Sequence, residues 1–96
     1  MKVTYAPRAI ADLTRIAARS RRVFGPAGAV ALETFMRATI ARLAVVPESG
    51  LSMPQRPNVW VVPLVRYPFK IFYTIESDTL TILHIRHAAR RPWEDE

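Results

Sequence analysis

The apolar residues of this chain are spaced as in a helix through its first half and as in β-strands through its last third. From Arg8 to Arg22 the helical positions are Ala9, Ile10, Leu13, Ile16 and Ala17. After Phe24-Gly25-Pro26 the same spacing continues until it ends before Pro47, with Leu32, Phe35, Met36, Ile40 and Leu43. Since glycine and proline interrupt the period, the sequence predicts two amphipathic helices that form an antiparallel hairpin.

The other side of the first predicted helix is polar and mostly basic. Its members are Arg8, Asp12, Arg15, Arg19 and Arg22. Because the apolar residues occupy the opposite side, we expect this whole stripe to face solvent. The run Arg19-Ser20-Arg21-Arg22 closes the helix. Its simplest interpretation is that cations complement the negative end of the helix dipole.

The strand pattern begins with residues 3–5 and returns over residues 59–65, 69–75 and 79–87. Prolines and glycine make residues 47–57 a loop. The last strand carries apolar side chains on both faces, as an interior strand does. The predicted fold is therefore α+β, a single domain over residues 1–96 in the order β-α-α-β-β-β. The helical hairpin is packed on a small, mainly antiparallel sheet.

Composition limits the functions open to this chain. A chain of 96 residues has room for one core. It has no cysteine and only two histidines, so we expect no disulfide, no metal site and no cofactor. The longest apolar stretch, Val59 to Val65, is far shorter than the roughly 20 residues that cross a bilayer. Residues 1–5 lack a signal-peptide core, so we expect a cytoplasmic protein with no membrane contact.

The formal net charge is +6, from 14 basic residues against 8 acidic ones. Most of the basic residues are arginines, and the last three positions are all acidic, so the rest of the chain is more basic still. Such a surface attracts polyanions or an acidic protein partner, because arginine forks match phosphate and carboxylate oxygens. The alternative is a charge that serves solubility alone.

Basic residues of the last two strands are predicted to meet at one end of the sheet. With Ser77 near the middle of the hairpin, Lys70 falls opposite His84, and Pro68 falls opposite Arg86. The cluster on this shared face is Arg66, Lys70, His84 and Arg86. A nuclease could use such a cluster without a metal, with cations stabilising the scissile phosphate and a histidine moving a proton. No carboxylate base is evident beside it, so a structural or binding role for the histidine stays open.

Aromatic residues add two further features. Four of them alternate with aliphatic residues, namely Trp60, Phe69, Phe72 and Tyr73. We interpret these as core rather than as a platform on which bases stack. Beyond the last strand, Arg90 and Arg91 stand beside Trp93, a combination that can stack on bases or grip a protein surface. In the alternative interpretation Trp93 covers the core and the two arginines are solvated.

Both ends of the chain carry ordered motifs. Residues 3–16 are Val-Thr-Tyr-Ala-Pro-Arg-Ala-Ile-Ala-Asp-Leu-Thr-Arg-Ile. The second motif runs from Arg66 to Arg91. It contains a strand that begins with an arginine, an acidic turn, and a second strand that ends in histidine and arginine residues. Together these motifs resemble the RelE/ParE family of toxins. The resemblance implies the toxin of a type II toxin–antitoxin system, bound in a hetero-oligomer by a cognate antitoxin that wraps its basic surface and silences it.

The resemblance leaves the target open, because ParE-like members act on DNA gyrase and block replication, whereas RelE-like members cut messenger RNA on the ribosome. We favour a ParE-like gyrase inhibitor, which needs no catalytic residue, with Arg90, Arg91 and Trp93 as target contacts. The alternative is a metal-independent, ribosome-dependent endoribonuclease. Its residues would be Arg66, Lys70, Arg86 and His87, although the tail has no tyrosine. A third alternative is a domain without toxicity that binds DNA or protein.

Overall fold

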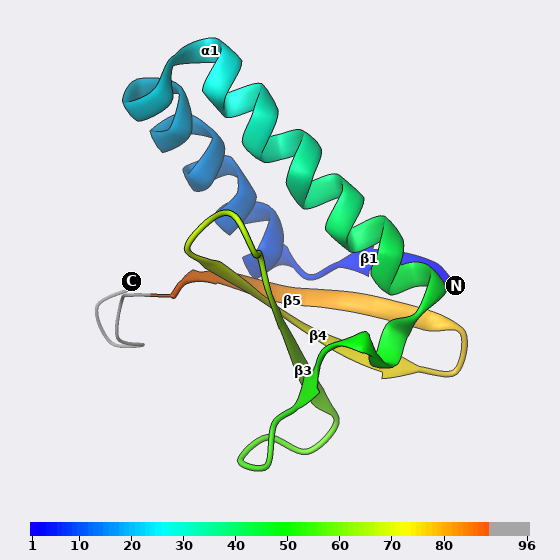
Figure 1. The fold of residues 1–96 in the computed structure, drawn as a ribbon. Coiled ribbons are helices and arrows are strands. Elements are labelled where there is room, and N and C mark those ends of the chain that lie inside the picture. Colours follow the sequence, from blue (N-terminus) through cyan, green and yellow to red (C-terminus); the bar gives the residue numbers. More distant parts are fainter. Residues whose placement is uncertain (89–96) are drawn as a thin grey trace.

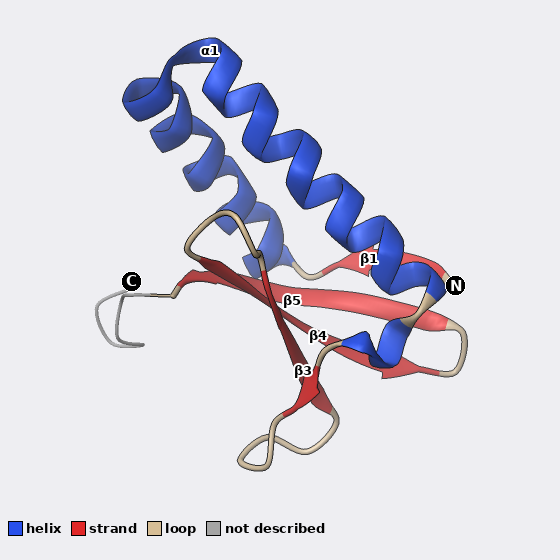
Figure 2. Cartoon of the chain, viewed as in Figure 1, coloured by secondary structure: helices blue, strands red, loops and turns tan. Residues whose placement is uncertain are grey.

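The chain folds into a helical hairpin lying across one face of a five-stranded sheet (Figure 1, Figure 2). A computed structural model describes residues 1–88. The elements are β1 (Lys2–Tyr5), α1 (Pro7–Val45), the 3-10 helix η1 (Pro47–Ser49), β2 (Leu51–Ser52), β3 (Val59–Pro63), β4 (Phe69–Glu76) and β5 (Thr79–His87). The predicted α+β class and element order are confirmed, with the short η1 and β2 added inside the segment expected to be a loop.

Gly25 divides α1 into two arms, residues 7–24 and 26–45, which lie side by side (Figure 1). The φ of Gly25 is 78°, in the left-handed region that glycine adopts without strain. Pro26 follows directly and has no N–H to donate to the preceding turn. The chain therefore reverses direction here, and the break predicted at residues 24–26 is confirmed.

The sheet has the strand order β1-β5-β4-β3-β2. β1 runs parallel to β5, and every other neighbouring pair is antiparallel. β5 is thus an interior strand, which explains its apolar side chains on both faces. The hairpin of α1 covers one face of the sheet, and we call the opposite face the open face (Figure 1).

The pairing of β4 with β5 differs from the register that we expected. Lys70 pairs with Arg86, and Phe72 pairs with His84. The partners expected from the turn, His84 for Lys70 and Pro68 for Arg86, are wrong. The error is two residues along the strand, which keeps each side chain on its expected face.

Two local features shift this register. The turn between the strands has two residues rather than being centred on Ser77. A β-bulge then leaves Leu83 as an extra residue between Ile82 and His84. Beyond the bulge the alternation is reset, so Ile85 joins Ile82 in the core and His84 turns to the open face.

Tyr73 lies at the centre of the core between the hairpin and the sheet. Its side chain is fully buried, and its hydroxyl donates to the Pro47 carbonyl at 2.7 Å and accepts from the Gly50 N–H at 3.2 Å. Trp60 stacks on Tyr73 with ring centroids 6.5 Å apart, and Phe69 packs against the same core. For these three aromatic residues the core interpretation is confirmed. The other buried core members are Ala9, Ile16, Leu32, Met36, Ile40, Leu43, Leu64, Ile71, Leu80, Ile82 and Ile85.

Two expected core positions of the first arm are exposed instead. The side chain of Ile10 is 55% exposed, and Ala17 is exposed as well. Both line a groove of about 680 Å³ to which the second arm contributes Val30 and Met36. The apolar stripe of the first arm is wider than the sheet can cover, so part of it forms this open groove.

Asp12, which we expected on the solvent-facing stripe, is fully buried. Its Oδ2 accepts a hydrogen bond from the backbone N–H of Ile85 at 2.9 Å, and its Oδ1 accepts one from Arg15 Nη2 at 2.7 Å. The pairing of β1 with β5 ends where Tyr5 meets Ile82. The carboxylate therefore takes up a strand N–H that β1 does not reach. A buried N–H without an acceptor is costly, which is the physical reason for a polar residue here.

Replacing Asp12 tests this role. For Asp12→Ala we expect the free energy of unfolding to fall by about 2 to 4 kcal/mol, because Ile85 loses its acceptor and Arg15 its counter-ion. Asp12→Asn keeps an acceptor oxygen and should lose about half as much. Urea unfolding followed by circular dichroism measures both changes.

The matched control is Arg37→Ala, which breaks the exposed ion pair between Arg37 Nη2 and Glu33 Oε2, 3.0 Å apart. Its free energy of unfolding should change by less than about 0.5 kcal/mol, because exposed pairs are weak. Equal unfolding midpoints for Asp12→Ala and Arg37→Ala would show that the carboxylate does not tie α1 to β5.

Candidate functional site

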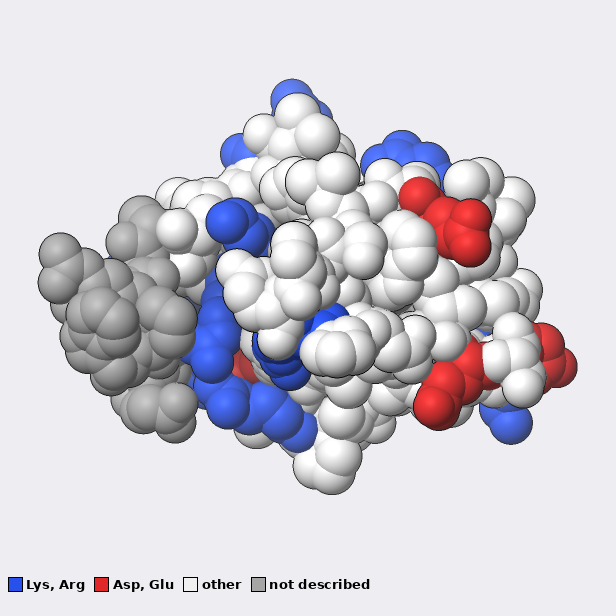
Figure 3. Space-filling view, turned by 90° about the horizontal axis from the view of Figure 1, so that it is seen from below, with Lys and Arg blue, Asp and Glu red and all other residues white. Residues whose placement is uncertain are grey.

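Basic side chains gather on the open face of the sheet, toward the end where β5 finishes (Figure 3). Lys70 of β4 and Arg86 of β5 form a cross-strand pair there. Arg56 reaches the same face from the loop between β2 and β3. Acidic side chains lie mainly toward the opposite end (Figure 3). This end of the open face therefore carries mainly positive charge, which attracts anions.

His84 lies among these cations. Its ring stacks on Phe72 with centroids 4.4 Å apart and an interplanar angle of 19°. Arg56 Nη1 is 3.1 Å from His84 Nε2, and Arg56 Cζ is 6.0 Å from the centroid of the Phe72 ring. The guanidinium is thus hydrogen-bonded to His84 and lies over the Phe72 ring. We call this group the open-face cluster; it consists of Arg56, Lys70, Phe72, His84 and Arg86.

Burial lowers the pKa of His84 from 6.5 to about 4, helped by the charges of Arg86, Arg56 and Arg8 and opposed by Asp12. The ring is therefore neutral at neutral pH. A guanidinium only donates hydrogen bonds, so Nε2 accepts from Arg56 and the ring proton sits on Nδ1. Nδ1 is buried and has no hydrogen-bond partner among residues 1–88. His84 thus acts as an acceptor that holds Arg56 in place.

The four residues expected to serve a nuclease do not form one cluster. Lys70 and Arg86 lie together on the open face, as predicted. His87 faces the helix side, because successive strand residues alternate, and its ring packs edge-on against Phe69 with centroids 5.4 Å apart. Arg66 is exposed in the loop between β3 and β4. His87 therefore lies on the opposite face of the sheet from Lys70 and Arg86.

The predicted sheet-end cluster is confirmed in part. Lys70, His84 and Arg86 share the open face, although His84 pairs with Phe72 rather than with Lys70. The sequence does not predict that Arg56 belongs to this cluster, because Arg56 lies in a proline-rich loop and no hydrophobic periodicity indicates the path of that loop. Phe72 is buried, as expected, but its ring stacks on His84 on the open face and lies outside the core cluster beneath the helices. Alternation along β4 could have separated it from its neighbour Tyr73.

Arg90, Arg91 and Trp93, which we expected to contact the target, lie outside the described residues. Within residues 1–88, no group of three His, Cys, Asp or Glu side chains is placed to hold a metal ion. No helix in this part of the chain is long and apolar enough to span a membrane. What the open-face cluster offers chemically is anion binding.

Solved structures share this fold. The chain is similar to a structure of the chromosomal ParDE toxin–antitoxin system from P. aeruginosa, with a TM-score of 0.79 and 25% identity, over 91% of this chain and 95% of that one. The isolated E. coli RelE toxin has a TM-score of 0.66 and 11% identity, over 97% of this chain and 89% of that one. The intact E. coli RelBE complex has a TM-score of 0.66 and 12% identity, over 93% and 98%. No curated protein sequence matches the chain.

These likenesses define a class, the small α+β toxins of the ParE and RelE type. A family model described as the ParE toxin of the type II toxin–antitoxin system parDE matches residues 3–92. The chain therefore belongs to the ParE toxin family of type II toxin–antitoxin systems. The resemblance found in the sequence motifs is confirmed.

The protonation of His84 gives the fold a measurable pH dependence. The unfolded state, with a pKa of 6.5 for this histidine, binds the proton more tightly than the folded state, with a pKa of about 4. The contribution of His84 to stability is therefore complete above pH 6.5 and is lost as the pH falls toward 4. Urea unfolding should show a decrease of up to about 3 kcal/mol from this group.

His84→Gln isolates this contribution, because glutamine does not titrate and keeps an oxygen that can accept from Arg56. The difference in unfolding free energy between the wild type and His84→Gln should be largest near neutral pH and should shrink as the pH falls. Parallel curves for the two proteins would assign the pH dependence to other groups.

Proposed function

We propose that this toxin inhibits DNA gyrase and thereby blocks replication, and that a cognate antitoxin binds and neutralises it. The observation that carries the proposal is the ParE family model, which spans residues 3–92. The ParDE structure is 25% identical to the chain, whereas the two RelE-containing structures share its fold at 11% and 12% identity. The proposal of a gyrase target rests on this greater similarity to ParE toxins.

The open-face cluster fits a binding role better than a catalytic one. A general base works best with a pKa near the working pH and with a nitrogen free to take the proton. The pKa of His84 is about 4, and its Nε2 is occupied by Arg56. Asp12, the carboxylate whose charge acts on His84, is already bound to Ile85 and Arg15. The arrangement therefore supports a toxin that acts by contact.

The groove between the arms of α1 supports a protein partner. It has a volume of about 680 Å³ and is lined by the exposed apolar side chains of Ile10 and Val30. Exposed apolar surface on a chain this small is stabilised when a partner covers it. The E. coli RelBE structure is a toxin–antitoxin complex. By analogy, an antitoxin is the partner that we infer here, and the neutralised form is a hetero-oligomer.

Gyrase supercoiling assays test the proposal. Purified toxin should inhibit supercoiling, and added antitoxin should restore it. The variant Arg90→Ala/Arg91→Ala/Trp93→Ala should need at least about tenfold more protein for half-inhibition, because arginine and tryptophan dominate binding energy at interfaces. Its urea unfolding must match that of the wild type, so that a loss of inhibition reports on contact with the target. Full inhibition by the triple variant would remove these residues from the mechanism.

A ribosome-programmed messenger RNA cleavage assay on the same sample distinguishes the ribonuclease alternative. Lys70 and Arg86 are the paired cations that could stabilise a scissile phosphate. Lys70→Ala/Arg86→Ala is therefore the variant to include in that assay. Cleaved message with intact supercoiling would overturn gyrase inhibition. Expression without any effect on growth would leave a domain that only binds.

A further inference from the structure

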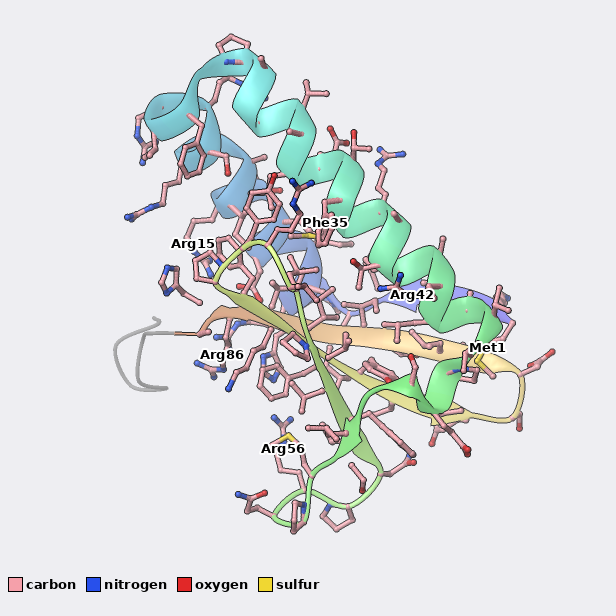
Figure 4. All side chains as sticks on the ribbon, viewed as in Figure 1. Met1, Arg15, Phe35, Arg42, Arg56 and Arg86 are labelled. Carbon is pink, nitrogen blue, oxygen red and sulfur yellow. The ribbon has the colours of Figure 1, made fainter. Side chains whose placement is uncertain are left out.

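A second basic surface lies on the helix side of the sheet, beside the first arm of α1. It is a pocket of about 220 Å³, lined by Arg15, Arg19 and Arg22 of the arm and by Phe69 and His87 of the sheet. We call it the arginine pocket. Its sheet residues face away from the open-face cluster, so the two surfaces are separate. Arg15 extends toward the end of the molecule where Arg86 also lies (Figure 4).

The arginines of this pocket form one stripe along the arm. Arg15, Arg19 and Arg22 are spaced by four and three residues, which places them on one face over about 10 Å. Like charges at these spacings destabilise a helix. The helix dipole favours cations only within the last turn, and Arg15 lies more than two turns before the arm ends at residue 24. The ion pair with Asp12 accounts for Arg15 and the dipole for Arg22, but neither accounts for Arg19.

Asp12 fixes the position of Arg15 at the pocket rim. The two side chains meet at 2.7 Å, yet Arg15 remains 53% exposed and keeps further N–H donors directed to solvent. A guanidinium that is already oriented loses little freedom when it binds an anion. Arg19 and Arg22 are exposed and form no ion pair with any residue in the described part of the chain. Their charges are therefore available to a ligand.

The chemistry of the pocket matches an oxyanion. Guanidinium groups bind phosphate oxygens through paired N–H donors. The pocket is also lined by Ile16, Ile85 and Phe69, and these apolar groups reduce the screening of charge by water. A protein partner is held mainly by buried apolar anchors, and the groove between the arms offers those instead. A stripe of exposed arginines fits an extended polyanion better.

We propose that the arginine pocket binds a backbone phosphate of duplex DNA, so that the toxin contacts DNA in addition to its protein target. Arg15 and Arg19 bind the phosphate, and Arg22 extends the contact along the strand. This contact reads no sequence, because phosphates are common to all sequences. The proposal goes beyond gyrase inhibition and does not depend on it.

Fluorescence anisotropy with a labelled DNA duplex and the full-length toxin, without gyrase, tests the proposal. Arg19→Ala/Arg22→Ala should weaken binding at least about tenfold and reduce the slope of log K against log salt by about 1 to 2, as expected for one or two lost phosphate contacts. Arg15 is left in place because its ion pair with Asp12 supports the fold. Urea unfolding of the variant checks that the fold is retained.

The matched control is Arg21→Ala/Arg42→Ala, which removes the same charge from α1. Arg21 lines the groove between the arms, and Arg42 lies near the end of the second arm, far from Arg15 (Figure 4). We expect this variant to bind DNA within about threefold of the wild type, because it loses no phosphate contact. If both double variants lose the same affinity for DNA, the loss reflects net charge alone, and the proposal that the arginine pocket binds DNA is overturned.

Two competitors identify the ligand class. Single-stranded RNA of the same length and a polyglutamate peptide are each titrated against the bound duplex. Weak competition by both supports duplex DNA. Stronger binding of either competitor that is lost in Arg19→Ala/Arg22→Ala would overturn duplex DNA as the ligand. Because gyrase is absent from the measurement, the result stands whether or not gyrase is the target.

Discussion

The hydrogen bond from the Ile85 N–H to the Asp12 carboxylate joins the two layers of this toxin. β1 accompanies β5 only as far as Ile82, and beyond that point the strand runs beneath the first arm, with no further strand among residues 1–88 on that side to accept its N–H. A carboxylate on the arm supplies the acceptor. Its negative charge also attracts Arg8 and Arg15 to the same place, at 3.6 Å and 2.7 Å. The carboxylate that the Ile85 N–H needs as an acceptor thus also holds two arginines at this end of the molecule.

The other cations are organised by a histidine that carries no charge. His84 is surrounded by Arg56, Arg86 and Arg8, and a charged ring there would add to their mutual repulsion. Because burial keeps the ring neutral, it can accept a hydrogen bond from Arg56 and support that side chain over Phe72. The result is a cluster of positive charge around a neutral ring, with Arg56 held by His84. Such an arrangement is suited to holding a partner.

The helices and the longer strands could be predicted because hydrophobic period and a glycine–proline break are local properties of the sequence. What could not be predicted depends on contacts between distant segments. Asp12 shares a helical stripe with arginines, and its burial follows only from where β1 ends. The centre of the turn and the bulge at Leu83 each shift the register of β5 by one residue, and neither has a clear signature in the sequence. Arg56 lies in a loop, and its position depends on its tertiary contacts with His84 and Phe72.

The bulge at Leu83 also decides which side chains at the end of β5 face the helices. Before the bulge the even-numbered residues, such as Leu80 and Ile82, face the core. After it the odd-numbered residues, such as Ile85, face the core instead. Outward positions there, such as Arg86, can change identity while inward Ile85 keeps its place in the core. Because Tyr73↔Ile82 and Phe72↔His84 flank the bulge, a chain without Leu83 would form a regular ladder in which both sets keep their faces. The bulge therefore absorbs the extra residue, so that Arg86 lies on the open face while Ile85 lies in the core.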